Sequence, residues 1–199
     1  TFSENAVGLL NSNVTLGVNN LSYGCLHVLS GSQVFVTNGL ASLTVGQLGY
    51  GVLTIDGGTC RVDCLYLANG TNSVLSFGSG MLSVKTGLVS NNMPMVIGSG
   101  TGEATLEHWG GGVVTVYSAV DFQNNSRWRI YADATTNPVL DVHGTLSFGL
   151  DVSLFPVTTN AYATLDRRLI AVADTVTTVP TVQENDRLAV RIEDAEGGR

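Results

Sequence analysis

The sequence has few charged residues, and positive charge is the scarcest. Charged residues make up 13% of the 199 residues, Lys85 is the single lysine, and the net charge is −7. No basic run forms the kind of surface that follows a phosphate backbone or binds an anionic membrane. Nucleic acid and anionic membrane surfaces are therefore not expected partners.

Long apolar runs are also missing, although 44% of the residues are hydrophobic. A membrane-spanning helix needs about 20 mostly apolar residues, and Gly, Asn, Ser or Thr interrupts every long uncharged stretch. Residues 5–55 include no Asp, Glu, Lys or Arg, yet Asn and Gly break this stretch at intervals typical of strands and turns. We expect no membrane insertion.

Cysteine is rare as well. Cys25, Cys60 and Cys64 are too few, and odd in number, for a disulfide framework. We expect them to be buried as small hydrophobic residues. A bridge between Cys60 and Cys64 is one alternative, and a metal site with His27 is another, although this spacing is not a recognised zinc pattern.

The sequence is rich in glycine, with 24 residues, and it repeats internally. Shifting the chain against itself aligns Tyr23 with Tyr50 at an offset of 27 residues, and Val52 with Val74 at an offset of 22. Further pairs, which include a third offset of 32 and a fainter last copy, are Leu26 with Leu53, Val28 with Ile55, Phe35 with Val62, Leu53 with Leu75, Ile55 with Phe77, Val74 with Leu106, Leu82 with Val114, and residues 140–144 with residues 53–57. Periods in this range are typical of solenoids.

Each repeat consists of a short alternating strand, a corner that contains glycine and a second short strand. Such short strands cannot bury their apolar face alone, so successive units must stack. Because no helical spacing is sustained, we predict an all-β fold, a parallel β-helix of about five to six irregular coils between Val14 and Phe155. The residues expected to point inward are Leu26, Val28, Leu53, Ile55, Leu75, Phe77, Leu140 and Val142.

An irregular β-sandwich is the alternative architecture. The pairs Asn38-Gly39, Asp56-Gly57 and Asn69-Gly70 are typical of two-residue hairpin turns, which a sandwich would use. However, the flanking strands repeat in the same order, and parallel stacking explains this where antiparallel pairing does not. The repeat therefore favours the solenoid.

The best-repeated unit resembles a known family of repeats. The runs LTVG (43–46), GYGVLTIDGG (49–58) and LYLANG (65–70) resemble the autotransporter-associated β-strand repeats, whose pattern is roughly LTVG…G.G.LTI.GG…LYLGNG. Similar runs occur in exported surface proteins with a PEP-CTERM sorting tail. The resemblance covers about residues 20–150 and implies a right-handed parallel β-helix and export to the cell surface. It does not extend to a translocator barrel or a sorting tail, so it implies nothing about anchoring.

Charge is concentrated at the C-terminal end, where residues 166–199 hold 12 of the 25 charged residues. Residues 168–173 and 187–192 are predicted to form a strand pair, joined by a linker over residues 175–182. A polar terminal element is needed where a solenoid would otherwise expose unpaired backbone. We therefore expect a β-helix over residues 1–155 and a charged C-terminal β cap with a tail over residues 156–199.

Three groups of ionisable residues are candidates for chemistry. They are Glu103 and Glu107 with His108, Asp121 with Arg127 and Arg129, and Asp141 with His143. Alternation in a strand places Asp141 and His143 on the same side, as a base and its orienting partner require. Solvated outward residues produce the same pattern, and the sequence has no serine-elbow, Walker or HExxH motif. We expect no catalytic, cofactor-binding or metal site.

These observations predict a non-catalytic structural protein of the cell surface or extracellular space. The ends and edges of a solenoid can pair with another subunit, and the uncharged N-terminal stretch removes the repulsion that would oppose association. A stalk, sheath or filament subunit that binds copies of itself is therefore the expected function.

The alternative function is a carbohydrate-binding or polysaccharide-cleaving β-helix, such as an adhesin or a tailspike-like protein, with surface polysaccharide as its partner. An enzyme would gain support if Asp121, Arg127, Asp141 and His143 met in one groove. A sugar-binding surface could be formed by four aromatic residues, although we expect them to stack inside the coils: Trp109, Tyr117, Trp128 and Tyr131.

Overall fold

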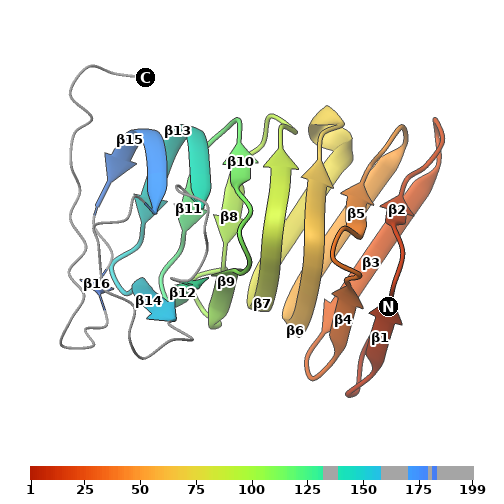
Figure 1. Cartoon of the computed structure of the whole chain (residues 1–199), viewed down its shortest axis with the longest axis horizontal. Coiled ribbons are helices and arrows are strands. Elements are labelled where there is room, and N and C mark those ends of the chain that lie inside the picture. The colour runs from red at the N-terminus through yellow and green to blue at the C-terminus, as the bar shows by residue number, and fades with distance from the viewer. Residues whose placement is uncertain (132–138, 158–169, 179–180, 183–199) are drawn as a thin grey trace.

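The computed structural model describes residues 1–131, 139–157, 170–178 and 181–182. Within them the chain is almost entirely strand, and the strands lie side by side from the N-terminal end of the molecule to the other (Figure 1). The pairings between these strands are all parallel. The fold is therefore a parallel β-solenoid of about 6 turns, as the repeat predicted.

The elements are β1 (Val7–Leu10), β2 (Val14–Leu16), β3 (Tyr23–Leu29), β4 (Gln33–Val36), β5 (Ser42–Val45), β6 (Tyr50–Leu67), the 3-10 turn η1 (Gly70–Asn72), β7 (Ser73–Val89), β8 (Met95–Ile97), β9 (Ala104–His108), β10 (Val114–Val116), β11 (Val120–Phe122), β12 (Ser126–Tyr131), β13 (Leu140–Phe148), β14 (Ser153–Val157), β15 (Ala171–Thr177) and β16 (Thr181–Val182).

The strands stack into three ladders, which we name sides A, B and C. Side A contains β3, the opening segments of β6 and β7, β8, β11 and the end of β13. Side B contains β1, β4, the middle segments of β6 and β7, β9, β12, β14 and β16. Side C contains β2, β5, the ends of β6 and β7, β10, the start of β13 and the start of β15.

Each coil crosses sides A, B and C in that order, apart from the first, for which β1 and β2 give sides B and C. We number the coils by their strands: β1 and β2 form coil 1, β3 to β5 coil 2, β6 coil 3, β7 coil 4, β8 to β10 coil 5, and β11, β12 and residues 140–142 coil 6. The strands after residue 142 begin a further turn.

Alternating side chains explain why these short segments form strands. In β5, Leu43 and Val45 are buried, whereas Ser42 and Thr44 lie at the surface side of the sheet. This period of two supplies one apolar side chain to the interior for every two residues. Stacking the coils joins these side chains into one continuous core.

The expected interior is confirmed. Leu53, Ile55, Leu140 and Val142 are fully buried, and Leu75 is partly buried against the core. The other residues predicted to point inward are also buried: Leu26, Val28 and Phe77.

The register confirms the repeat in coils 2 to 4 on side A. Tyr23 pairs with Tyr50 and Leu26 with Leu53, as the offset of 27 predicted, and Val52 pairs with Val74, as the offset of 22 predicted. On side B the first offset is wrong by one residue, because Arg61 rather than Val62 pairs with Phe35.

The predicted offset of 32 is wrong. Leu82 pairs with Leu106 on side B, and Val114 pairs with Gly87 on side C. The faint last copy is also misaligned, since Leu140 pairs with Val114 on side C while Leu53 lies on side A. Insertions are accommodated separately at each corner, so no single offset describes all three sides.

The corners between sides A and B are tight in coils 3 and 4. Gly80 has a φ of 92°, and a Cβ built on it would lie 2.3 Å from the carbonyl oxygen of Gly58 in the preceding coil. Only glycine fits this combination of positive φ and close backbone approach.

The strands described beyond residue 155 continue the solenoid. β15 pairs in parallel with β13, so residues 175–177 are strand although a linker was predicted there. β16 pairs with β14. The strand predicted over residues 187–192 and the tail lie outside the described residues. No helix in the described part of the chain has the length and apolar character needed to cross a membrane.

Candidate functional site

The outer surface of side B carries a row of aligned side chains. The register places Arg61 beside Ser83, Ser83 beside Glu107, Glu107 beside Arg129, and Arg129 beside Phe155. Each residue comes from a different turn, because equivalent positions of a solenoid stack on one another. We call these five residues the outer row of side B.

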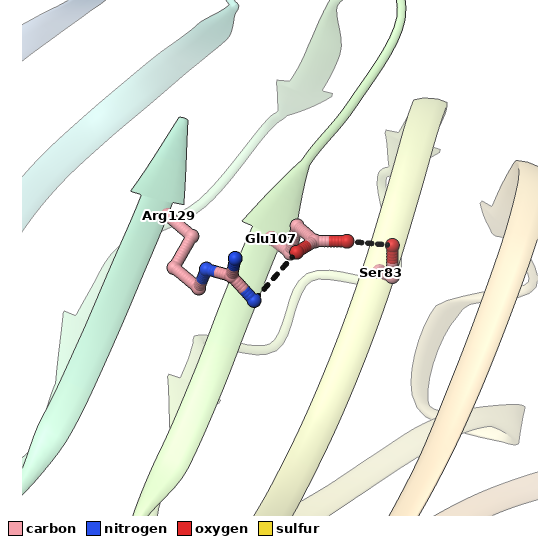
Figure 2. A network of polar contacts seen from close by, with 3 residues as sticks. All are labelled: Ser83, Glu107 and Arg129. Carbon is pink, nitrogen blue, oxygen red and sulfur yellow. Dashed lines mark hydrogen bonds and ion pairs between the residues drawn. The ribbon is translucent and has the colours of Figure 1, made fainter. Parts of the chain in front are cut away.

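Glu107 is at the centre of this row (Figure 2). Ser83 Oγ donates a hydrogen bond of 2.6 Å to Glu107 Oε1, and Arg129 Nη1 lies 3.0 Å from Glu107 Oε2. Only 4% of Glu107 is exposed, although it belongs to an outer surface. Its charge is therefore stabilised by these two partners, and charge-assisted bonds of this kind are about twice as strong as neutral ones. The network ties coils 4, 5 and 6 together.

Trp109 covers part of the outer row. The guanidinium carbon of Arg61 lies 4.0 Å from the centre of the Trp109 ring, a cation–π contact. Arg61 belongs to coil 3 and Trp109 follows β9 in coil 5, so the contact reaches across coil 4, where Ser83 lies between them in register. This explains why Ser83 is buried on an outer surface. The Trp109 Nε1 atom is buried and has no hydrogen-bond partner among the described residues.

A hollow lies beside the outer row, at the corner between sides A and B in the last turns. Its volume is about 370 Å³, and it is lined by Thr101, Glu103, Asn125, Ser126, Arg127, Asp151 and Ser153. Arg127 Nη2 lies 2.8 Å from Glu103 Oε2, and both side chains are about half exposed. The guanidinium carbon of Arg127 is also 5.5 Å from the ring centre of Phe155. Polar residues alone line this hollow.

His108 and Trp128 form the polar part of the interior. Trp128 Nε1 donates a hydrogen bond of 2.7 Å to His108 Nδ1, so the neutral imidazole has its proton on Nε2. Burial lowers the pKa of His108 to about 3, and the ring is neutral at pH 7. Trp128 also packs against Phe122 and Phe148, with ring centres 5.6 and 6.4 Å away. This cluster stabilises the core and does not reach solvent.

The structure rearranges the three predicted groups. It pairs Glu103 with Arg127 and Glu107 with Arg129, while His108 points into the core. Each acidic residue is paired with the arginine opposite it on the next coil, which the grouping by sequence did not foresee.

Asp121 is separated from the arginines that follow it in the sequence. It lies on side A, where it accepts hydrogen bonds from Gln123 and from Ser147, the latter at 2.7 Å. Arg127 and Arg129 lie on side B. The chain turns a corner between these positions, so nearness in the sequence does not become contact.

Asp141 and His143 do lie together, as alternation predicted. His143 Nε2 is 3.4 Å from Asp141 Oδ2, and the imidazole stacks on Tyr117 with ring centres 4.4 Å apart. They follow side C, however, whereas Asp121 is on side A and Arg127 on side B. The four residues that would support an enzyme therefore do not meet in one groove.

The sequence analysis did not identify Ser83, Arg61 and Asp63 as important. Ser83, Glu107 and Arg129 are spaced by 24 and 22 residues, the true offsets of side B, so a separate alignment of that side would have found them. Asp63 is fully buried, and its Oδ2 accepts the backbone N–H groups of Asn38 and Ala41 at 2.8 and 3.0 Å. No sequence signal marks this corner.

The cysteines are free, and their burial differs from the expectation. Cys60 is buried, and burial raises its pKa to about 12, so it remains a thiol. Cys64 is half-buried, and the prediction of burial is wrong for Cys25, which is exposed. In the part of the chain that the structure describes, no group of three or more His, Cys, Asp or Glu residues could hold a metal ion.

The aromatic residues also differ from one another. Trp128 stacks inside the coils as expected, but Tyr117 is exposed on the surface, where it contacts His143. Trp109 lies at the outer surface against Arg61. The expectation of interior stacking is therefore confirmed for Trp128 and wrong for Tyr117 and Trp109.

The fold and this surface define the class of protein: a parallel β-solenoid with ion pairs between coils on one outer side. Comparisons with protein families, with curated proteins and with solved structures found no match. The resemblance to autotransporter-associated repeats stays a prediction from residues 43–70.

Proposed function

We propose that this protein is a non-catalytic structural element of the cell surface or extracellular space, which associates with copies of itself. Stacked coils with one continuous core form a stiff unit, the kind of body that a stalk, sheath or filament requires. The observation that carries the proposal is a group of exposed apolar side chains on coils that have no charge.

These side chains lie where side C meets side A in the first three coils. Their exposed fractions run from 40% to 103%, and we call them the corner cluster: Val18, Leu21, Tyr23, Leu48 and Tyr50. The two loops that hold them are in contact, since Gly49 N donates a hydrogen bond of 2.8 Å to Gly17 O. The rings of Tyr23 and Tyr50 stack with their centres 5.5 Å apart. The cluster is therefore continuous across neighbouring coils.

Leu21 is the most unusual member of the cluster. Its side chain is fully exposed, and its backbone has a φ of 65°, in the left-handed region. A branched apolar residue is disfavoured there by roughly 1–2 kcal/mol, and Gly or Asn would fit better. The position thus combines an unfavourable backbone with an unfavourable exposure. Contact with a partner would remove the second of these costs.

Charge favours a second copy of the same chain as that partner. No charged residue occurs between Glu4 and Asp56, so two such surfaces can meet without burying or opposing any charge. The negative net charge of the whole chain lies on the other coils. A two-fold contact between corner clusters keeps those coils apart.

A further contact is available along the solenoid axis. In the described residues β1 pairs with β4 and β2 pairs with β5, each on one side. The backbone groups on the other side can accept a further parallel strand. Lateral and axial contacts together would produce a layer or a bundle.

The proposed location rests on the composition and on the repeat resemblance. Low lysine and abundant Gly, Thr and Asn are common to exported surface proteins, and the runs over residues 43–70 resemble those of such proteins. Fractionation of the source cells tests this: we expect the protein in the surface or medium fraction, and recovery from the cytosol alone would contradict it.

Sedimentation velocity over a range of concentrations tests self-association. We expect the average mass to rise with concentration, and Leu21→Ser to weaken association at least tenfold, since burying a leucine contributes about 2 kcal/mol. Leu40→Ser is the matched control, because Leu40 is 81% exposed in the same uncharged stretch but at another corner. A monomer at every concentration, or equal effects of both variants, would overturn the proposal.

A further inference from the structure

We propose that the hollow between sides A and B in the last turns binds a neutral saccharide. The hollow exists because the chain is longer at these corners than elsewhere. Strands β6 and β7 run through the same corner without a break, whereas residues 98–103, 123–125 and 149–152 form loops there. In repeat proteins, insertions that recur on one face often form the binding surface.

The three loops are tied to one another by asparagine side chains. Asn125 Nδ2 donates a hydrogen bond of 3.1 Å to Gly100 O, and Leu150 N donates one of 3.0 Å to Asn124 Oδ1. Asn125 itself has a φ of 61°, a left-handed conformation that asparagine tolerates. The walls of the hollow are therefore held in place before any ligand binds, which lowers the entropy cost of binding.

The lining offers both donors and acceptors. Glu103 and Asp151 accept hydrogen bonds, Arg127 and Asn125 can donate them, and Thr101 can do both. Arg127 is already oriented by its ion pair with Glu103. Sugar hydroxyls are donors and acceptors at once, and planar carboxylate, amide and guanidinium groups can bind two neighbouring hydroxyls together. The mixture of groups thus matches a polyhydroxylated ligand.

Charge and polarity exclude other ligand classes. Two carboxylates against one guanidinium leave the hollow net negative, which disfavours an anionic ligand. The lining has no apolar wall for a hydrophobic ligand. A metal ion would need converging oxygen ligands, but the guanidinium of Arg127 occupies the lining.

An aromatic ring lies beside the hollow. Phe155 is two residues from Ser153, which lines the hollow, and its ring centre is 5.5 Å from the Arg127 guanidinium carbon. The C–H face of a sugar ring can pack on such a ring while its hydroxyls reach the polar lining. The volume of about 370 Å³ is within the range of roughly 300–1,000 Å³ found for small-molecule sites.

A glycan array with neutral and acidic oligosaccharides, probed with the full chain, tests this proposal. We expect binding to neutral glycans, and at least tenfold weaker binding of Arg127→Ala and Asp151→Ala. Asp56→Ala is the matched control, since Asp56 is an exposed carboxylate at the A–B corner of coil 3, where no hollow forms. Leu21→Ser should bind glycans normally, so that failure of this proposal is distinguishable from failure of self-association.

Several outcomes would overturn the proposal. They are the absence of binding to any glycan, binding to acidic glycans alone, and binding that neither variant of the hollow weakens. A thermal shift by Ca²⁺ that Asp151→Ala abolishes, without glycan binding, would identify a cation site instead.

Discussion

Coils 3 and 4 and coils 5 and 6 follow one backbone plan with different side chains. In coils 3 and 4 the strands β6 and β7 continue around the corners for 18 and 17 residues, and the core is largely aliphatic. In coils 5 and 6 short strands alternate with loops, the core includes Trp128 and His108, and ion pairs cross the outer surface. The parallel ladders nevertheless remain continuous through both regions.

This difference shows which features the fold requires. The ladder needs alternating residues of about the right size, while corners and outer positions can vary freely. Loops that lengthen a corner change what the surface presents and leave the stack above and below intact. The regular coils are therefore easily found in the sequence, and the irregular coils hold the polar groups available for binding.

The largest expected effect is on the aliphatic interior of the regular coils. Ile55→Asp should lower the free energy of unfolding by about 4 kcal/mol or more, because Ile55 is fully buried and the new carboxylate has no partner. Thr54→Asp, at the adjacent outward position, should change it by less than about 1 kcal/mol. Urea unfolding followed by circular dichroism measures both, and equal stabilities would contradict the inward register.

The second prediction concerns pH and the interior of coil 5. The folded state keeps His108 neutral down to about pH 3, whereas the unfolded state binds a proton below about pH 6.5. Stability should therefore fall by about 2 kcal/mol between pH 7 and pH 5, with a slope of up to about 1.4 kcal/mol per pH unit.

Variants separate His108 from other groups that titrate. His108→Gln keeps an acceptor for Trp128 Nε1 and should remove most of this slope. His27→Gln, on the outer face of side A, should retain it. A slope that survives in His108→Gln would mean that another group is responsible.

A smaller effect is expected on the outer row of side B. Glu107→Gln should destabilise the protein by about 1.5 kcal/mol, because the charge that Ser83 and Arg129 share is lost from a buried position. Glu103→Gln should cost less than about 0.5 kcal/mol, since its ion pair with Arg127 is half exposed. Thermal unfolding of both variants compares them, and an equal loss would show that burial of Glu107 contributes nothing.

The smallest effect is a gain in the uncharged coils. Leu21→Asn should raise the free energy of unfolding by about 0.5 kcal/mol, because asparagine tolerates the left-handed backbone that leucine resists. The same variant should associate less. Unfolding is measured at a concentration where the protein is monomeric, and unchanged or lower stability would contradict the strain at this position.

The sequence predicts the fold well where the coils have constant length. Strict alternation and the offsets of 27 and 22 residues placed Leu53 and Ile55 in the core and paired them correctly on side A. The offset of 32 failed because loops such as residues 98–103 shift side B and side C by different amounts. A comparison of whole repeats assigns one shift to all sides, whereas the solenoid has three.

The polar site was harder to predict for a related reason. Glu107 and Arg129 were noticed as charged residues, but their partnership depends on contacts between coils, 22 residues apart on side B. The burial of Glu107 results from side chains of other coils that cover it, and nothing in its own neighbourhood of the sequence indicates this. The hollow depends on three loops at once and has no local signal.

Two contacts described above reach over an intervening coil. Lys85 Nζ in coil 4 donates a hydrogen bond of 3.1 Å to Gly39 O in coil 2, and Arg61 in coil 3 contacts Trp109 in coil 5. A stack whose units touch only their neighbours can fray one unit at a time. Ties of longer range penalise a partly opened stack, so coils 2 to 5 should open in a single cooperative step. In hydrogen exchange, their amides should share one opening free energy, with the coils at either end exchanging sooner.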